Sequence, residues 1–275
     1  MEFYTEQDTE TFNDIPLLFI RTSLDKHVFR ITLNRPEKRN AFTPTMAAEI
    51  TFALAYAHYH SQVRCVILDA KGPVFCAGAD LNAFHDSSTD TINPNLPVPN
   101  QEIRLGDAFS QLLKPSIAIV EGSVLAGGFL LICGCTFVIS VPHVTFSLPE
   151  VKRGIWPMQV MASLMPIIPH RKILEMAITG KSYTAAEAVE MGLVTNIYEP
   201  ENIKAEAGNL AEIICSNAPF AIRSGMEAYH NLSNIPEREH HIYLKKQLEK
   251  LLDSEDSKEG SLAFKQKRNP VWQGR

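Results

Sequence analysis

The sequence predicts an α/β protein, in which helices cover a sheet of mostly buried strands. Short apolar runs of strand length recur along the chain, as at 28–33, 63–69 and 117–120. Segments with helical signals lie between them, which is the β-α-β order of an α/β core. The chain has 275 residues, 45% of them apolar and 21% charged, so it can bury a large core.

The first part of the chain begins with a polar, acidic segment. We expect residues 1–14 to form a disordered N-terminal extension. Residues 17–20 and 28–33 flank a polar turn and predict a β-hairpin. A Thr-Pro pair then gives a helix-start signal, which predicts a helix over 44–60. The apolar run 63–69 is the next strand.

Two loops of small residues follow predicted strands. Residues 74–80, VFCAGAD, come after the strand 63–69, and Ala126-Gly127-Gly128 comes after the strand 117–120. Loops of this kind present backbone N–H groups without a side chain in the way. Together they could form a hole for an oxyanion, and Glu150, just after Pro149, supplies a carboxylate. This combination is suited to moving a proton next to a carbonyl group.

The remaining segments continue the alternation and end in a helical layer. Residues 85–100 are rich in Asp, Ser, Asn and Pro and predict a mobile loop, in which His85 is interpreted as a solvated histidine. A helix is expected over 101–113. Further strands are predicted at 137–139, 144–146 and 193–195, and further helices at 185–192, 201–217, 219–232 and 235–253.

Composition and charge exclude several classes of protein. The net charge of −5 gives no bulk attraction for nucleic acid. No apolar run is long enough to span a membrane, and the acidic N-terminus does not resemble a secretion signal. Five cysteines are an odd number for a disulfide framework, and Cys133 and Cys135 lack a second ligand pair, so no metal site is predicted. We expect a cytoplasmic protein.

Five motifs in order resemble the crotonase (enoyl-CoA hydratase/isomerase) superfamily. They are NRPEKRNA at 34–41, FCAGAD at 75–80, AGG at 126–128, PE at 149–150 and the tail KEGSLAFKQKR at 258–268. The resemblance implies a crotonase-like ββα spiral core over 15–200. It also implies a C-terminal helical region over 201–275 that assembles a homotrimer or a dimer of trimers.

The resemblance also assigns roles in an acyl-CoA site. Backbone N–H groups of Ala79 and Gly127 match the oxyanion-hole donors, and Glu150 matches the second of two hydratase glutamates. The first would stand at Leu130, which cannot hold water or accept a proton. One glutamate fits the branch that moves a double bond from 3-enoyl-CoA to 2-enoyl-CoA. Hydration, another lyase or decarboxylase activity, and acyl-CoA binding without catalysis remain alternatives.

The same resemblance implies contacts with coenzyme A, which the substrate carries, so no separate cofactor is expected. The matching positions are Lys38, Arg39, Ala77, Phe264 and Lys267, and the last two are expected to contact the nucleotide, in the same subunit or a neighbouring one.

Three other positions are interpreted more cautiously. Asp80 is expected to fix its loop, and Asn82 stands where many relatives carry a lysine. The segment around Trp156 and Met158 is open to two interpretations, as the wall of an acyl pocket or as ordinary core.

Overall fold

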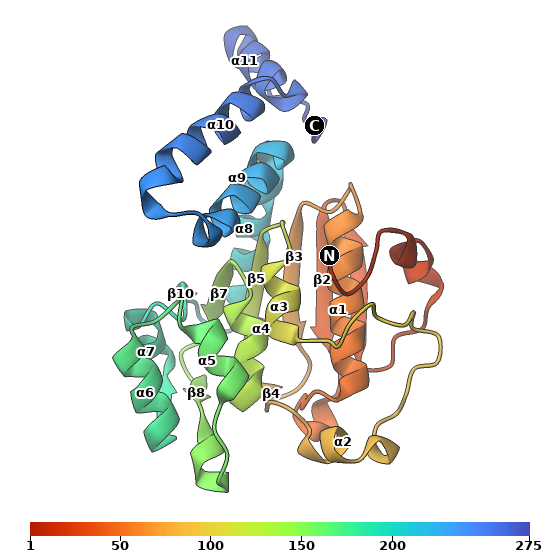
Figure 1. Ribbon diagram of the computed structural model, residues 1–275, viewed down its shortest axis with the longest axis vertical. Helices are drawn as coiled ribbons and strands as arrows, with labels where there is room; N and C mark the ends of the chain where they lie inside the picture. Colours follow the sequence, from red (N-terminus) through yellow and green to blue (C-terminus); the bar gives the residue numbers. More distant parts are fainter.

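A computed structural model describes all residues, 1–275, and places two sheets side by side at its centre (Figure 1). The six-stranded sheet has the order β1 (Ile20–Asp25), β2 (Val28–Leu33), β3 (Cys65–Ala70), β5 (Ser116–Val120), β7 (Phe137–Ser140) and β10 (Asn196–Ile197). The four-stranded sheet has the order β4 (Val74–Cys76), β6 (Ser123–Leu125), β8 (Thr145–Ser147) and β9 (Ser182–Thr184). Only the outermost pairs, β1–β2 and β8–β9, are antiparallel.

The two sheets are built by successive turns of a spiral. The chain runs from β3 to β4, from β5 to β6 and from β7 to β8, so each turn adds one parallel strand to each sheet. The carboxyl ends of β4, β6 and β8 therefore lie together, and the loops that follow them share one edge. The predicted α/β spiral is confirmed.

Eleven helices surround the sheets. They are α1 (Pro44–Tyr59), α2 (Leu81–His85), α3 (Leu105–Ser110), α4 (Phe129–Cys133), α5 (Met158–Leu164), α6 (His170–Thr179), α7 (Ala185–Glu190), α8 (Ile203–Ser216), α9 (Pro219–Asn231), α10 (His240–Leu252) and α11 (Glu255–Gln266). The helix α1 begins as predicted, because the Thr43 side chain accepts a hydrogen bond from the N–H of Met46 and Pro44 takes the first helical position. No helix is both long and apolar enough to cross a membrane.

The N-terminal segment differs from the disordered extension expected over 1–14. Residues Gln7–Asp14 form a 3-10 helix, and the side chains of Phe3 and Tyr4 are fully buried. Phe12 stacks on Tyr56 of α1, with their ring centroids 4.2 Å apart. The polar composition of the segment concealed three aromatic side chains whose partners lie in distant parts of the chain, such as α1 and β2, so the prediction of disorder is wrong.

Other boundaries moved by a few residues. The hairpin forms, but its first strand is β1 rather than 17–20, and the helix expected over 101–113 is limited to α3. The short strand expected over 193–195 is β10. The segment 85–100 carries a short 3-10 helix at Ser87–Thr89, and it is anchored by Asn93, whose side-chain amide donates to a carboxylate oxygen of Glu49 at 2.9 Å.

The C-terminal helices project from the core. Helix α8 packs on β3, β5 and β7, whereas α9, α10 and α11 extend beyond the sheets (Figure 1). No residue of α10 is buried. Its apolar side chains include Ile242, Leu248 and Leu252, each of which is more than half exposed.

Candidate active site

Three predicted site residues, Ala79, Gly127 and Glu150, line one cavity of about 330 Å3. They follow β4, β6 and β8, whose carboxyl ends the spiral brings to one edge. Ala77 and Leu130 line the same cavity. The structure therefore assembles the loop residues that the sequence had only placed in separate motifs.

The backbone of Ala79 is oriented by its contacts with Phe42. The N–H of Phe42 donates to the carbonyl of Gly78, and the N–H of Asp80 donates to the carbonyl of Phe42, both at 2.9 Å. Successive N–H groups of an extended segment point to opposite sides. The Ala79 N–H therefore points away from Phe42.

The two glycine-containing loops approach each other so closely that side chains do not fit between them. Gly78 has φ +94°, and a Cβ there would lie 2.9 Å from the backbone nitrogen of Gly127. A Cβ on Gly127 would in turn lie 3.3 Å from the nitrogen of Ala79. Because Gly127 is in the first turn before α4, its N–H has no helical acceptor. The geometry places two backbone donors next to each other, as an oxyanion hole requires.

The loop that carries Ala79 is fixed by a partly buried ion pair. The Arg35 guanidinium donates to an Asp80 carboxylate oxygen and to the Ala41 carbonyl, both at 2.8 Å. Burial of the Asp80 carboxyl opposes its ionisation, but the hydrogen bond and the charge of Arg35 outweigh this and lower its pKa. The expected loop-fixing role of Asp80 has a structural basis in this pair.

Glu150 is the acidic side chain of the cavity, which Arg153 also lines. Its side chain is only 8% exposed, and its Oε2 atom is buried without a hydrogen-bond partner. Burial raises its pKa above the usual glutamate value, although a backbone hydrogen bond and the charge of Arg153 work in the opposite direction. A carboxylate with a raised pKa and an unpaired oxygen is a competent proton acceptor.

The surroundings of Glu150 are mainly apolar. Leu130 is 5% exposed and lines the cavity where the family pattern has a first glutamate, and no other acidic side chain lines it. Phe42, Phe84, Leu130 and Gln159 also line a neighbouring cavity of about 700 Å3. That cavity is walled by α1, the segment 84–105 and the buried Tyr4, and it offers space for an acyl group next to Glu150.

The residues expected to bind coenzyme A are only partly brought to the site. Lys38 and Arg39 are exposed beside it, and the Arg39 carbonyl accepts a hydrogen bond from the N–H of Ala77 at 3.0 Å. Phe264 and Lys267 lie on and just after α11, which is at the opposite end of the molecule from α2 and β4 (Figure 1). Their contact with coenzyme A stays a prediction, and it requires a second copy of the chain to bring them to the site.

The lining of the cavity separates the two residues of the segment that was open to two interpretations. Met158 lines it and is 69% exposed, whereas Trp156 does not line it and donates its indole N–H to the Met161 sulfur at 3.0 Å. His85 is exposed and lines neither of the two cavities, in agreement with a solvated loop histidine.

Some residues that shape the site were not predicted from the sequence. Phe42 orients Ala79, and Gln159 lines both cavities. The buried Asn40 side chain accepts the N–H of Arg35 and donates to the carbonyls of Lys71 and Val74. Only Asn40 and Arg35 lie in a recognisable motif, so only they could have been found before the fold was known.

Comparisons with known proteins agree with this geometry. A family model described as enoyl-CoA hydratase/isomerase matches residues 24–275. The chain belongs to this family. Its members act on acyl-CoA thioesters.

Individual relatives cover almost the whole chain. A mevalonyl-coenzyme A hydratase of Aspergillus fumigatus is 32% identical over 250 residues, which are 90% of this chain and 91% of that protein. A carnitinyl-CoA dehydratase of Escherichia coli K12 is 33% identical over 254 residues, 90% of this chain and 95% of that protein. The crystal structure of an enoyl-CoA hydratase from Mycobacterium tuberculosis has a TM-score of 0.82 at 30% identity, covering 94% of this chain and 99% of that one.

Proposed function

We propose that this family member moves a double bond, converting a 3-enoyl-CoA into a 2-enoyl-CoA through Glu150 alone. The observation that carries the proposal is that Glu150 is the single acidic residue lining the cavity, with Leu130 beside it. Proton transfer from one carbon to another two positions away needs one group that accepts the proton and returns it.

The chemistry follows from the positions of these groups. The ionised Glu150 takes a proton from C2, next to the thioester carbonyl. The negative charge that develops on the carbonyl oxygen is stabilised by the N–H groups of Ala79 and Gly127, each worth roughly 3 kcal/mol. The protonated Glu150 then returns the proton at C4, and the double bond ends between C2 and C3. The apolar Leu130 keeps water away from the carboxylate.

A second candidate is hydration or dehydration at the same carbons. It is favoured by the names of the relatives, which are a hydratase and a dehydratase. The Gln159 side chain, which lines the cavity, is the group that would hold the water in place of the missing glutamate.

We further propose that the chain works as a homotrimer or a dimer of trimers. The support is the exposed apolar surface of α10, which a neighbouring copy would cover, and the distance of Phe264 and Lys267 from their own site. The mass of the purified protein by light scattering tests this assembly, and a monomer would contradict it.

The decisive experiment follows the ultraviolet absorbance of the conjugated enoyl thioester. With a trans-3-enoyl-CoA, the wild type should raise this absorbance, and Glu150→Gln should lower kcat by about 100-fold or more while the thioester still binds. The matched control is Glu190→Gln, an exposed carboxylate on α7, which should keep the wild-type rate. A loss of absorbance with a trans-2-enoyl-CoA, and no rise with the 3-enoyl isomer, would refute isomerisation in favour of hydration.

A further inference from the structure

A second cavity, distinct from the acyl-CoA site, lies at the other end of the sheet. It has a volume of about 330 Å3 and shares no lining residue with the cavity of Glu150. Its core side is formed where β3 and β5 begin, at Arg64 and Pro115, whereas the catalytic loops follow the carboxyl ends of strands. The six residues of β3 alone separate the two ends by roughly 20 Å, at about 3.3 Å per residue.

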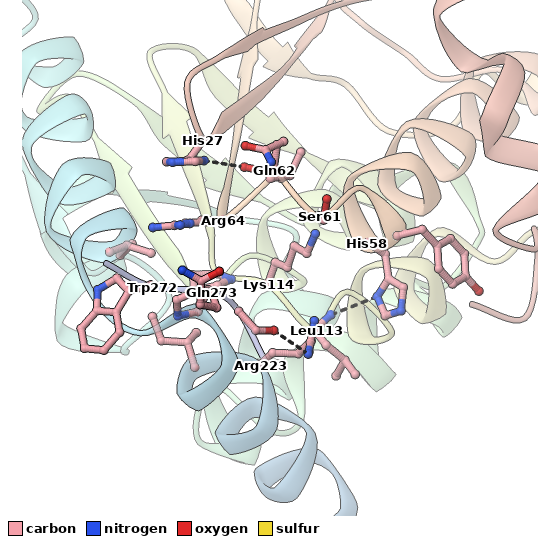
Figure 2. A pocket seen from close by; sticks show the side chains of 17 residues that line it. His27, His58, Ser61, Gln62, Arg64, Leu113, Lys114, Arg223, Trp272 and Gln273 are labelled. Atoms are coloured by element: carbon pink, nitrogen blue, oxygen red, sulfur yellow. Dashed lines mark hydrogen bonds between the residues drawn. The ribbon is translucent and has the colours of Figure 1, made fainter. Parts of the chain in front are cut away.

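The cavity is lined by positive charge without any acidic residue. Arg64, Lys114 and Arg223 converge on it from three different segments, as Figure 2 shows. None of the three forms an ion pair with an aspartate or glutamate anywhere in the chain. In a protein with a net charge of −5, three cations gathered without a counter-charge are an unusual arrangement.

The hydrogen bonds of these cations leave donors free. Arg64 donates to the Cys215 carbonyl at 3.0 Å, and Arg223 donates to the Gly274 carbonyl at 3.3 Å, each through one nitrogen of its guanidinium. Lys114 is 8% exposed and donates to the carbonyls of Ala57 and His60, at the end of α1. An ammonium has three donors and a guanidinium five, so all three side chains retain N–H groups for a ligand.

Burial of a cation opposed only by neutral carbonyls is costly. Burial, together with the charge of Arg223, lowers the pKa of Lys114 to about 7. His58 lines the same cavity, and burial, the charge of the N-terminus and the charges of Lys114 and Arg223 lower its pKa to about 4, so this imidazole stays neutral. An anion in the cavity would supply the missing negative charge.

We propose that this cavity binds a small oxyanion, a phosphate or carboxylate group, between Arg64, Lys114 and Arg223. Bidentate guanidinium groups match the geometry of such anions, and the ammonium adds a point charge. The bound anion would connect the core, through Arg64 and Lys114, to helix α9, through Arg223. It would therefore hold the C-terminal helices against the sheet.

The test is calorimetric titration of the intact protein with inorganic phosphate, and separately with succinate, at constant ionic strength. We expect one anion per chain, and Arg64→Gln or Arg223→Gln should weaken binding by about tenfold or more. The matched control is Arg171→Gln, an exposed and unpaired arginine on α6, which should bind as the wild type does. Intrinsic fluorescence gives an independent readout, because Trp272 lines the cavity.

Four outcomes would overturn the proposal. One is the absence of binding to the wild type, and another is equal binding by all three arginine variants. The third is displacement of phosphate by a saturating acyl-CoA, which would show that phosphate occupies the coenzyme A site instead. The fourth concerns a different occupant of the cavity, a second copy of the chain, and is measured by light scattering on the same samples. Loss of the oligomer in Arg223→Gln would assign the cavity to a contact between copies and overturn anion binding.

Discussion

Replacing Gly78 with alanine should separate the two halves of the oxyanion hole. The added Cβ would lie 2.8 Å from the Cβ of Ala126 and 2.9 Å from the nitrogen of Gly127, closer than such atoms normally approach. The obstacle at Gly127 is backbone, so it cannot rotate out of the way. The two loops must move apart, and the donors of Ala79 and Gly127 move with them.

The magnitude has two parts. Loss of one aligned donor costs roughly 3 kcal/mol of transition-state stabilisation, which lowers kcat by about 100-fold or more. Alanine at a φ of +94° also costs about 1–3 kcal/mol of folding free energy. The rate is measured from the absorbance of the conjugated thioester with a saturating 3-enoyl-CoA, and the stability by urea unfolding.

The control is Gly192→Ala, which isolates the cost of the backbone conformation. Gly192 has φ +82° at the end of α7, and a Cβ there would meet only the Ile167 carbonyl, at an ordinary 3.6 Å. Gly192→Ala should lose comparable stability and keep its kcat. If Gly78→Ala kept its kcat within about twofold of the wild type, the close approach of the loops would not be what aligns the donors.

Four further predictions concern three side chains, those of Arg35, Glu150 and Phe12. Arg35→Gln should destabilise the fold by about 2–3 kcal/mol in thermal unfolding and lower kcat, because it leaves the Asp80 carboxylate partly buried without its cation. An unchanged melting temperature would contradict this prediction. Because burial raises the pKa of Glu150 and only its ionised form accepts a proton, kcat/KM should fall as the pH falls through a value above the ordinary glutamate pKa of about 4.3. Because burial opposes the charged form, ionisation of Glu150 lowers the stability of the fold as the pH rises through that native pKa. Glu150→Gln should therefore be at least as stable as the wild type in urea at pH 7. A clear loss of stability would refute the argument. Phe12→Ala should cost about 3–5 kcal/mol of unfolding free energy, since it empties the place stacked on Tyr56, whereas a truly disordered segment would show no loss.

The two loops that follow β4 and β6 could be predicted from the sequence because they depend on local rules. Small residues after a strand are recognisable in the printed chain, and so are the glycines at Gly78 and Gly127. The spiral that brings these loops to one edge comes from pairing between distant strands, such as β4 with β6, and it was reached only through a family resemblance. The contacts of Phe42 and Gln159 have no local signature at all.

The errors in the fold have a common physical origin. Residues 1–14 lack any apolar period, yet Phe3 is buried, and the buried rings of Tyr4 and Phe12 pack on α1. Helix α1 is buried on nearly all sides, so its own sequence gave no indication of which face would take these aromatics. The basic cavity could not be predicted from the sequence at all, because Arg64, Lys114 and Arg223 are far apart in the chain and come together only in the folded structure.

The buried N-terminal segment has a consequence for how such an enzyme can diversify. Tyr4 packs in the core and also forms part of the wall of the larger cavity next to Glu150. Changes at the start of the chain therefore alter one wall of that cavity without altering the loops that bear Ala79 and Gly127. This part of the cavity is encoded far from those loops, so it can vary independently of them.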